Sequence, residues 1–138
     1  MNLIDVKSPA DLKGLSISEL TDLTAQARQA LMTKVSEHGG HFGPPMGVAE
    51  MIMALHYVFN SPVDKIVYDV SHQSYVHKMV TGRALAFLDH DHYDDVTGYT
   101  DPTESEHDFF NIGHTSTSIS LASGLATARN LKGDSENI

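Results

Sequence analysis

The chain contains no cysteine, which excludes disulfides, thiolate catalysis and cysteine-ligated zinc sites. Positive charge is also scarce, with 9 Lys and Arg residues against 18 Asp and Glu residues and a formal net charge of −9. Nucleic acids and anionic membrane surfaces are bound by clustered Lys and Arg side chains. Neither is therefore expected as a partner.

Long apolar runs are missing as well, since none approaches the ~18 residues of a membrane-spanning helix. Residues 1–15 mix acids with apolar residues and lack the apolar centre of a signal peptide. Hydrophobic residues make up 41% of the chain and charged residues 20%, which is typical of a globular domain. We therefore expect one cytoplasmic domain with a real core and no internal boundary.

Residues 16–38 show the spacing of an amphipathic helix. Ser16 and Glu19 match the capping-box pattern that begins helices, and Gly39 and Gly40 provide a C-terminal stop. Apolar residues recur at helical spacing between these ends and predict one inward face. The residues expected on that face are Ile17, Leu20, Leu23, Ala27, Leu31 and Val35.

A second helix is predicted from about residue 47 to residue 59, with prolines on both sides. Pro44 and Pro45 are expected to hold the chain extended before it, and Pro62 follows it as a stop. His56, inside this apolar helix, is expected to be a partly buried core residue. The expected inward residues are Val48, Met51, Ile52, Leu55 and Phe59.

The remaining chain predicts an α/β domain, mostly helical with one or two parallel strands. The β-branched run at residues 65–70 predicts a strand, and a short helix should follow over residues 74–80. A last helix is expected over residues 116–131. Its many small residues favour close packing, so we expect it to be buried. Residues 88–108 form a long polar stretch, which is typical of a functional or mobile loop.

Three histidines, His41, His72 and His114, lie beside Gly or Ser in turns between apolar segments, where polar sites form. His41 follows two glycines, which permit close backbone approach to a ligand; alternatively, the glycines only end the helix and His41 is a surface residue. His72 directly follows the predicted strand, and ligands of parallel α/β sheets bind at the carboxyl ends of strands. The alternative is a helix cap formed by Asp69 or Ser71, with His72 beside it.

Other polar residues are open to two interpretations. Gly113 begins the segment GHTSTSIS, whose hydroxyls and free N–H groups could form an anion site at a helix N-terminus or an ordinary cap. His90 and His92 lie in the acidic run DHDHYDD, which could hold a divalent metal or be a solvated loop. His77 and Lys78 are expected on a solvated helix face.

The motifs, taken in order, resemble the N-terminal region of the 1-deoxy-D-xylulose-5-phosphate synthases. These are thiamine-diphosphate enzymes of the transketolase superfamily. Residues 39–83 read GGHFGPPMGVAEMIMALHYVFNSPVDKIVYDVSHQSYVHKMVTGR, and residues 104–133 read ESEHDFFNIGHTSTSISLASGLATARNLKG. The resemblance covers nearly all of residues 15–133, and several motifs in one order make it specific.

The resemblance implies roles for five residues. His41 matches a histidine that lines the active site and assists proton transfer during carboligation. His72 matches the histidine of the family's G-H-Q-A-Y-P-H-K motif, which contacts the cofactor. Gly113, His114 and Thr115 match a G-H-S segment that contacts the cofactor near its diphosphate. No residue of the chain is assigned as a metal ligand.

The same resemblance implies the reaction and its cofactors. The typical enzyme joins pyruvate, a 2-oxo acid, to the aldose phosphate glyceraldehyde 3-phosphate. The products are 1-deoxy-D-xylulose 5-phosphate, an isoprenoid precursor, and CO₂. Thiamine diphosphate and Mg²⁺ are the cofactors of the complete enzyme, which works as a homodimer. We therefore expect a homo-oligomer that acts on small-molecule substrates.

Several positions depart from the family's pattern and indicate a divergent branch. Ser71 replaces the glycine before His72, Val76 replaces a proline and Thr115 replaces a serine. Residues 44–46, Pro-Pro-Met, stand where the typical enzyme has a stretch of Ser, Asn and Gly type. These departures leave open a transketolase-like enzyme that uses other sugar phosphates.

The family also has parts that residues 1–138 do not contain. A strand leads into a G-D-G motif that, with a later Asn, holds Mg²⁺ and the diphosphate. Another domain supplies a Glu that activates the cofactor. We therefore interpret residues 1–138 as a partial diphosphate-side domain that ends before the G-D-G motif, is inactive alone and binds no cofactor. A non-catalytic binding or interaction module is the alternative.

Overall fold

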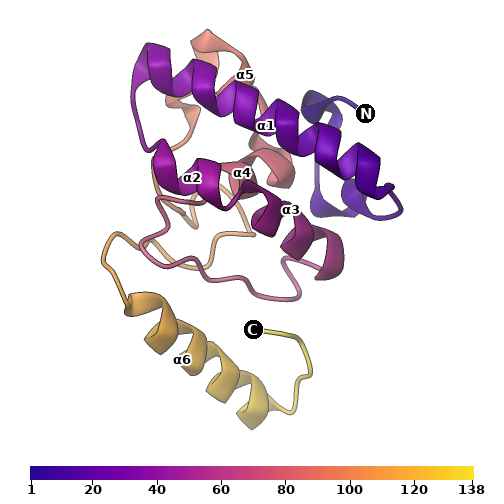
Figure 1. Cartoon of the computed structure of the whole chain (residues 1–138). Helices are drawn as coiled ribbons and strands as arrows, with labels where there is room; N and C mark the ends of the chain where they lie inside the picture. Colours follow the sequence, from indigo (N-terminus) through magenta and orange to yellow (C-terminus); the bar gives the residue numbers. More distant parts are fainter.

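The computed structural model describes residues 1–138 as a set of helices joined by long loops (Figure 1). A single core of 19 buried hydrophobic residues lies between the N-terminal segment, α1, α3 and the short helices of residues 75–88. The N-terminal segment adds two 3-10 turns, η1 (Leu3–Asp5) and η2 (Pro9–Leu12), which contact α1 and α3. None of the helices combines the length and the apolar character that a membrane span requires.

The first helix, α1 (Ile17–His38), confirms the prediction for residues 16–38. The Ser16 hydroxyl accepts the backbone N–H of Glu19, and the Glu19 carboxylate accepts the N–H of Ser16 at 2.8 Å. Gly39 ends the helix with φ +91°, a conformation in which glycine carries no steric penalty. The inward face is correct for Leu20, Leu23, Ala27 and Leu31, but Ile17 in the first turn is 75% exposed.

The second predicted helix exists as α3 (Ala49–Val58), but the segment before it is not extended. Pro44 and Pro45 lie in a separate short helix, α2 (Gly43–Gly47). The prediction of extended chain was wrong because proline is tolerated in the first turn, where backbone N–H groups have no partner within the helix. Within α3, Ile52 is buried as expected, whereas Met51 points outward and is 51% exposed.

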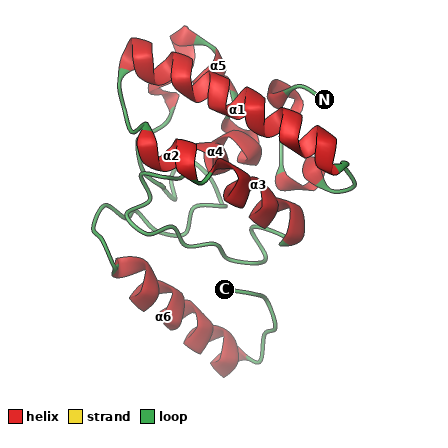
Figure 2. Ribbon diagram, viewed as in Figure 1, coloured by secondary structure: helices red, strands yellow, loops and turns green.

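No strand forms anywhere in the chain, so the prediction of one or two parallel strands was wrong (Figure 2). Residues 65–68 have no regular secondary structure, because a strand requires a neighbouring backbone to receive its hydrogen bonds. Only Lys65 finds one, donating its N–H to the carbonyl of Asn137 at 2.9 Å. The chain then turns at Val70 and Ser71, whose φ values are +58° and +64°.

A series of short helical turns follows and confirms the helix expected near residues 74–80. α4 (Tyr75–Lys78) continues directly into a π-helical turn, η3 (Met79–Arg83), and then α5 (Leu85–Leu88). Gly82 makes this bend possible, because its φ is +91° and a Cβ would lie 2.7 Å from the Lys7 carbonyl. The predicted loop of residues 88–108 contains one 3-10 segment, η4 (His90–Asp95), which packs on α5.

The last helix, α6 (Thr117–Lys132), has the expected bounds but not the expected burial. It lies apart from the other helices, beneath the loops in Figure 1. None of its residues is buried, and Ile119 and Leu131 are 74% and 85% exposed. Small residues permit close helix packing, but no other helix of the chain lies against them. The least exposed side chains of α6 form one half-buried strip along the helix. This strip includes Leu121, Ala122, Leu125 and Ala126.

Candidate functional site

The fold brings His41 and His72 together from segments 31 residues apart in sequence. His41 follows the two glycines after α1, and His72 follows the turn at Val70 and Ser71. Their ring centroids lie 5.2 Å apart with the planes nearly perpendicular, at 79°. The two residues that the sequence singled out independently therefore share one site.

Two tyrosines complete this site, and the sequence analysis missed both. Tyr75, at the start of α4, has its ring centroid 6.1 Å from that of His41. Tyr99, in the loop of residues 96–116, has its ring centroid 5.3 Å from that of His41. Tyr75 could have been found because it lies three residues after His72 on the following helix. Nothing local in the sequence marks Tyr99.

The environment of His41 favours a neutral imidazole. Burial lowers the pKa of His41, and the nearby His72 ring lowers it further, while the Gly98 carbonyl opposes both effects. A neutral imidazole has one nitrogen that donates and one that accepts a proton. This is the state from which a histidine can act as a general base near neutral pH.

His72 presents a polar atom for which the chain provides no partner. Its Nδ1 is buried and makes no hydrogen bond within the protein. Buried polar atoms of folded proteins nearly always have a partner, so an isolated one requires an explanation. A ligand donor or acceptor beside His41 would satisfy this atom.

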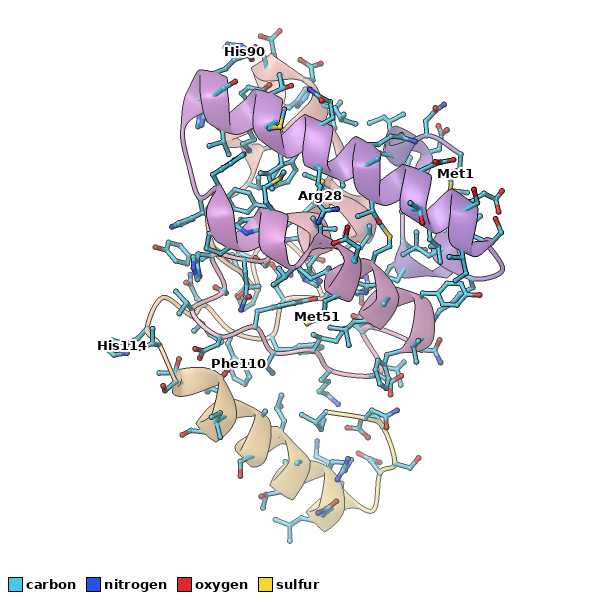
Figure 3. All side chains as sticks on the ribbon, in the orientation of Figure 1. Met1, Arg28, Met51, His90, Phe110 and His114 are labelled. Atoms are coloured by element: carbon cyan, nitrogen blue, oxygen red, sulfur yellow. The ribbon has the colours of Figure 1, made fainter.

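The segment Gly113–Thr115 lies at the edge of the same site. A Cβ on Gly113 would lie 4.0 Å from the Tyr99 ring, so Tyr99 connects this segment with His41. His114 and Thr115 are exposed, and His114 extends outward from the start of α6 in Figure 3. A shallow hollow of about 430 Å³ follows residues 111–117.

Two backbone N–H groups at the start of α6 are bound by a carboxylate of the chain itself. The Asp69 carboxylate accepts the N–H of Ser116 at 3.0 Å and the N–H of Ser118 at 3.3 Å. These backbone hydrogen bonds hold the pKa of Asp69 below its usual value. Asp69 therefore caps this end of α6, where a negative charge is favoured.

The Ser71 hydroxyl links the turn before His72 to the loop of residues 96–116. The hydroxyl donates to the Ile112 carbonyl at 2.5 Å and accepts the N–H of Thr100 at 3.0 Å. Its backbone adopts φ +64°, a left-handed conformation that a glycine adopts more easily. The serine that departs from the family's glycine thus ties the His72 turn to the loop that carries Tyr99.

A buried polar network includes His77 and Lys78 of α4, and it corrects the expectation that both are solvated. Both side chains are fully buried. His56 Nε2 lies 2.8 Å from His77 Nδ1, and His77 Nε2 lies 2.7 Å from the Asp108 carboxylate. His56, expected to be partly buried, is also fully buried.

Two positively charged side chains complete this network beside the loop that carries Tyr99. Arg83 donates to both oxygens of Asp108, at 2.8 and 2.9 Å, and to Glu104 at 3.0 Å. Lys78 donates to the same Glu104 oxygen at 2.6 Å. Burial alone would raise the pKa of Asp108, but hydrogen bonds from His77 and Arg83 outweigh it and hold that pKa well below its usual range. The network therefore fixes residues 97–108 on α4 and η3.

The acidic loop shows no metal centre, since no group of three or more His, Asp or Glu side chains converges anywhere in the chain. His92 pairs with Asp95 at 2.7 Å, and His38 pairs with Asp94 at 2.8 Å. Figure 3 shows His90 near α5 and His114 beside α6, at opposite ends of the molecule.

Comparison with known proteins extends over the whole chain. A family model described as 1-deoxy-D-xylulose-5-phosphate synthase matches residues 3–138. A protein of that name from Caldanaerobacter subterraneus is 52% identical over 136 residues, which cover 99% of this chain and 22% of the relative. A relative of the same name from Shouchella clausii is 50% identical and is matched over 100% of this chain and 22% of its own length. Another, from Symbiobacterium thermophilum, is 51% identical and is matched over 97% of this chain and 21% of its own length. The chain spans about a fifth of the length of these relatives.

Similarity of this extent shows that the chain is part of a known enzyme family. The chain belongs to the 1-deoxy-D-xylulose-5-phosphate synthase family and matches the N-terminal part of its members. The family indicated by the motifs is confirmed.

Proposed function

We propose that the chain is the N-terminal part of the diphosphate-side domain of a synthase that joins pyruvate to glyceraldehyde 3-phosphate. The products would be 1-deoxy-D-xylulose 5-phosphate and CO₂, with thiamine diphosphate and Mg²⁺ as cofactors of the complete enzyme. The observation that carries this proposal is the convergence of His41 and His72, 5.2 Å apart, in a chain that matches the family over its full length.

The residues present fit a bound cofactor beside His72. Its buried Nδ1 has no partner in the chain, and Tyr99 and Gly113 line the adjoining edge. When bound, thiamine diphosphate supplies a nucleophilic carbon for ketol transfer. His72 would orient the cofactor, and Gly113, His114 and Thr115 would lie toward its diphosphate. His41, held neutral by burial, would accept and return the proton that moves during carboligation.

The proposed reaction can be tested on the complete protein that contains this segment. Incubation with pyruvate, glyceraldehyde 3-phosphate, thiamine diphosphate and Mg²⁺ should release CO₂ and form 1-deoxy-D-xylulose 5-phosphate. The matched reaction replaces pyruvate with a ketose phosphate. Turnover of the ketose phosphate without any turnover of pyruvate would instead indicate a transketolase-like enzyme.

The isolated 138-residue chain should bind thiamine diphosphate weakly and show no synthase activity. The Asp69 carboxylate already accepts the N–H groups of Ser116 and Ser118 at the start of α6, and the net charge of −9 opposes a diphosphate. Calorimetric titration with thiamine diphosphate and Mg²⁺ measures the affinity. The Asp69→Asn variant should bind more tightly than the wild type, whereas Asp134→Asn, at an exposed residue beyond α6, should not. Micromolar binding by the unmodified chain would contradict this prediction.

The isolated chain should also self-associate through α6, which is consistent with a homo-oligomeric enzyme. The exposed Ile119 and Leu131 side chains are the reason, because burying apolar surface favours association. Light scattering from micromolar to millimolar concentration measures the mass. Replacing both residues by Gln should weaken association, whereas Ile17→Gln, which changes an equally exposed side chain on α1, should not. A stable monomer over the whole range would refute the prediction.

A further inference from the structure

Residues 97–99 form one wall of the site around His41. Burial lowers the pKa of His41, and a hydrogen bond from its ring to the Gly98 carbonyl opposes that effect. The Tyr99 ring lies edge-on to His41, with 5.3 Å between the ring centroids and 69° between the planes. A Cβ on Gly98 would lie 3.5 Å from Cε1 of His41, so this backbone closely approaches the imidazole. The position of the wall therefore determines the surroundings of His41.

Few hydrogen bonds hold the wall in this position. Within it, only the N–H of Thr97 donates to another group of the chain, the Glu104 carboxylate, at 2.7 Å. The Thr97 hydroxyl donates to the Tyr99 carbonyl at 2.8 Å, a contact inside the wall itself. Directly after the wall, Thr100 donates its N–H to the Ser71 hydroxyl at 3.0 Å. One end of the wall is therefore tied to Ser71, and the other end depends on Glu104.

Glu104 joins the wall to two positively charged side chains of the buried network. Its Oε1 accepts the Thr97 N–H, while its Oε2 accepts Lys78 Nζ at 2.6 Å and Arg83 Nη1 at 3.0 Å. Lys78 belongs to α4 and is fully buried, and Arg83 ends η3. The Glu104 side chain is only 11% exposed, so little water competes for its oxygens. One oxygen thus binds the wall and the other binds the helical turns behind it.

Only a carboxylate makes both contacts at once, because both of its oxygens accept hydrogen bonds. An amide at position 104 would have one accepting oxygen and one NH₂ group that only donates. In Glu104→Gln, the positive charges of Lys78 and Arg83 favour the amide oxygen on their side. The NH₂ group would then face the Thr97 N–H, two donors would meet, and the wall would be released.

We propose that Glu104 is a positioning residue for His41: it ties Thr97 to α4 and η3 and so holds the wall against the imidazole. The inference rests on the proposed proton-transfer role of His41. Glu104 makes no hydrogen bond to His41, and it acts through the Gly98 carbonyl and the Tyr99 ring. A misplacement of about 1 Å by a distant substitution can lower a rate by about 10²-fold, so a released wall should be measurable in turnover.

The first test combines Glu104→Gln with His41→Ala in a double-mutant cycle on the complete protein. Glu104→Gln alone should lower kcat about tenfold, with KM for pyruvate almost unchanged, because only the alignment of His41 is disturbed. In the His41→Ala background it should have almost no further effect, since the residue through which it acts is gone. An equal fall in both backgrounds would indicate a general structural role and would overturn the proposal, as would unchanged kcat in Glu104→Gln alone.

The second test measures the wall itself by hydrogen exchange of the complete protein, followed by mass spectrometry of peptides that contain Thr97. In Glu104→Gln, the Thr97 N–H should exchange about tenfold faster, as expected when a hydrogen bond to a charged group is lost. Glu104→Asp provides a second variant in case the amide disturbs folding. It keeps a carboxylate beside Lys78 and Arg83 but is one methylene shorter, so it should also release Thr97. Unchanged exchange in both variants would overturn the proposal.

Glu106→Gln is the matched control, because Glu106 lies two residues further along the same loop and its side chain is exposed. The same substitution there should leave both kcat and the exchange of Thr97 unchanged. If the complete protein showed no synthase activity, the proposed function would fail, while the exchange rate would still decide whether Glu104 holds the wall.

Discussion

Replacing His41 by alanine in the complete protein should lower kcat by about 10²- to 10⁴-fold, the usual contribution of a general acid or base. The affinity for thiamine diphosphate should change little, because His41 is assigned to proton transfer and not to holding the cofactor. Steady-state kinetics and calorimetric titration of the cofactor separate the two effects.

Two other variants sharpen this test. His72→Ala should weaken cofactor binding as well as turnover, because it removes the imidazole whose buried Nδ1 has no partner in the chain. His90→Ala is the control, since that side chain is 75% exposed near α5, far from the site. Unchanged turnover in His41→Ala would show that the proton-transfer assignment is wrong.

Replacing Asp108 by alanine should lower the free energy of unfolding by about 3–5 kcal/mol, as expected when one partner of a buried ion pair is removed. The side chain is fully buried, and its loss leaves both Arg83 and His77 without their carboxylate. Urea denaturation measures the change. Asp94→Ala is the control, because this side chain is 91% exposed and pairs only with His38 at the surface, so stability should hardly change.

The same buried network determines how the stability of the fold changes with pH. Burial lowers the pKa of His56 from 6.5 to about 2, so the unfolded chain takes up a proton below pH 6.5 that the folded chain does not. Stability should therefore fall as the pH drops below 6.5. The lowered pKa of Asp108 adds a further loss below its unfolded value of 3.8, and the Asp108→Ala variant should lack that part. Stability that was independent of pH between 6.5 and 4 would contradict the burial of His56.

Local patterns predicted the helices, and motifs predicted the site's histidines. Residues 16–38 carry both capping signals, and α1 has these bounds within one residue. The strand at residues 65–70 was mispredicted because β-propensity describes a residue's fit to a sheet and cannot supply the neighbouring strand. Lys65 alone finds a backbone partner there.

Contacts between distant segments could not be predicted from the sequence. His77 and Lys78 are polar residues on a short helix, and only the arrival of Asp108 and Glu104, 31 and 26 residues later, makes their burial tolerable. Tyr99 reaches His41 because this network holds its loop. Asp69 likewise meets α6 across a separation of 47 residues. Spacing within a motif contains no information about such pairings.

The serine at position 71 has a consequence for how the site can change over evolutionary time. Its left-handed backbone would relax with glycine, but the exchange would also delete the hydroxyl that joins Ile112 and Thr100. Each of those partners is buried and would lose a hydrogen bond at once. Replacement of Ser71 by glycine is therefore not expected to be neutral in this chain. A compensating change near Thr100 would have to come first, so the order of the two substitutions matters as well as their identity.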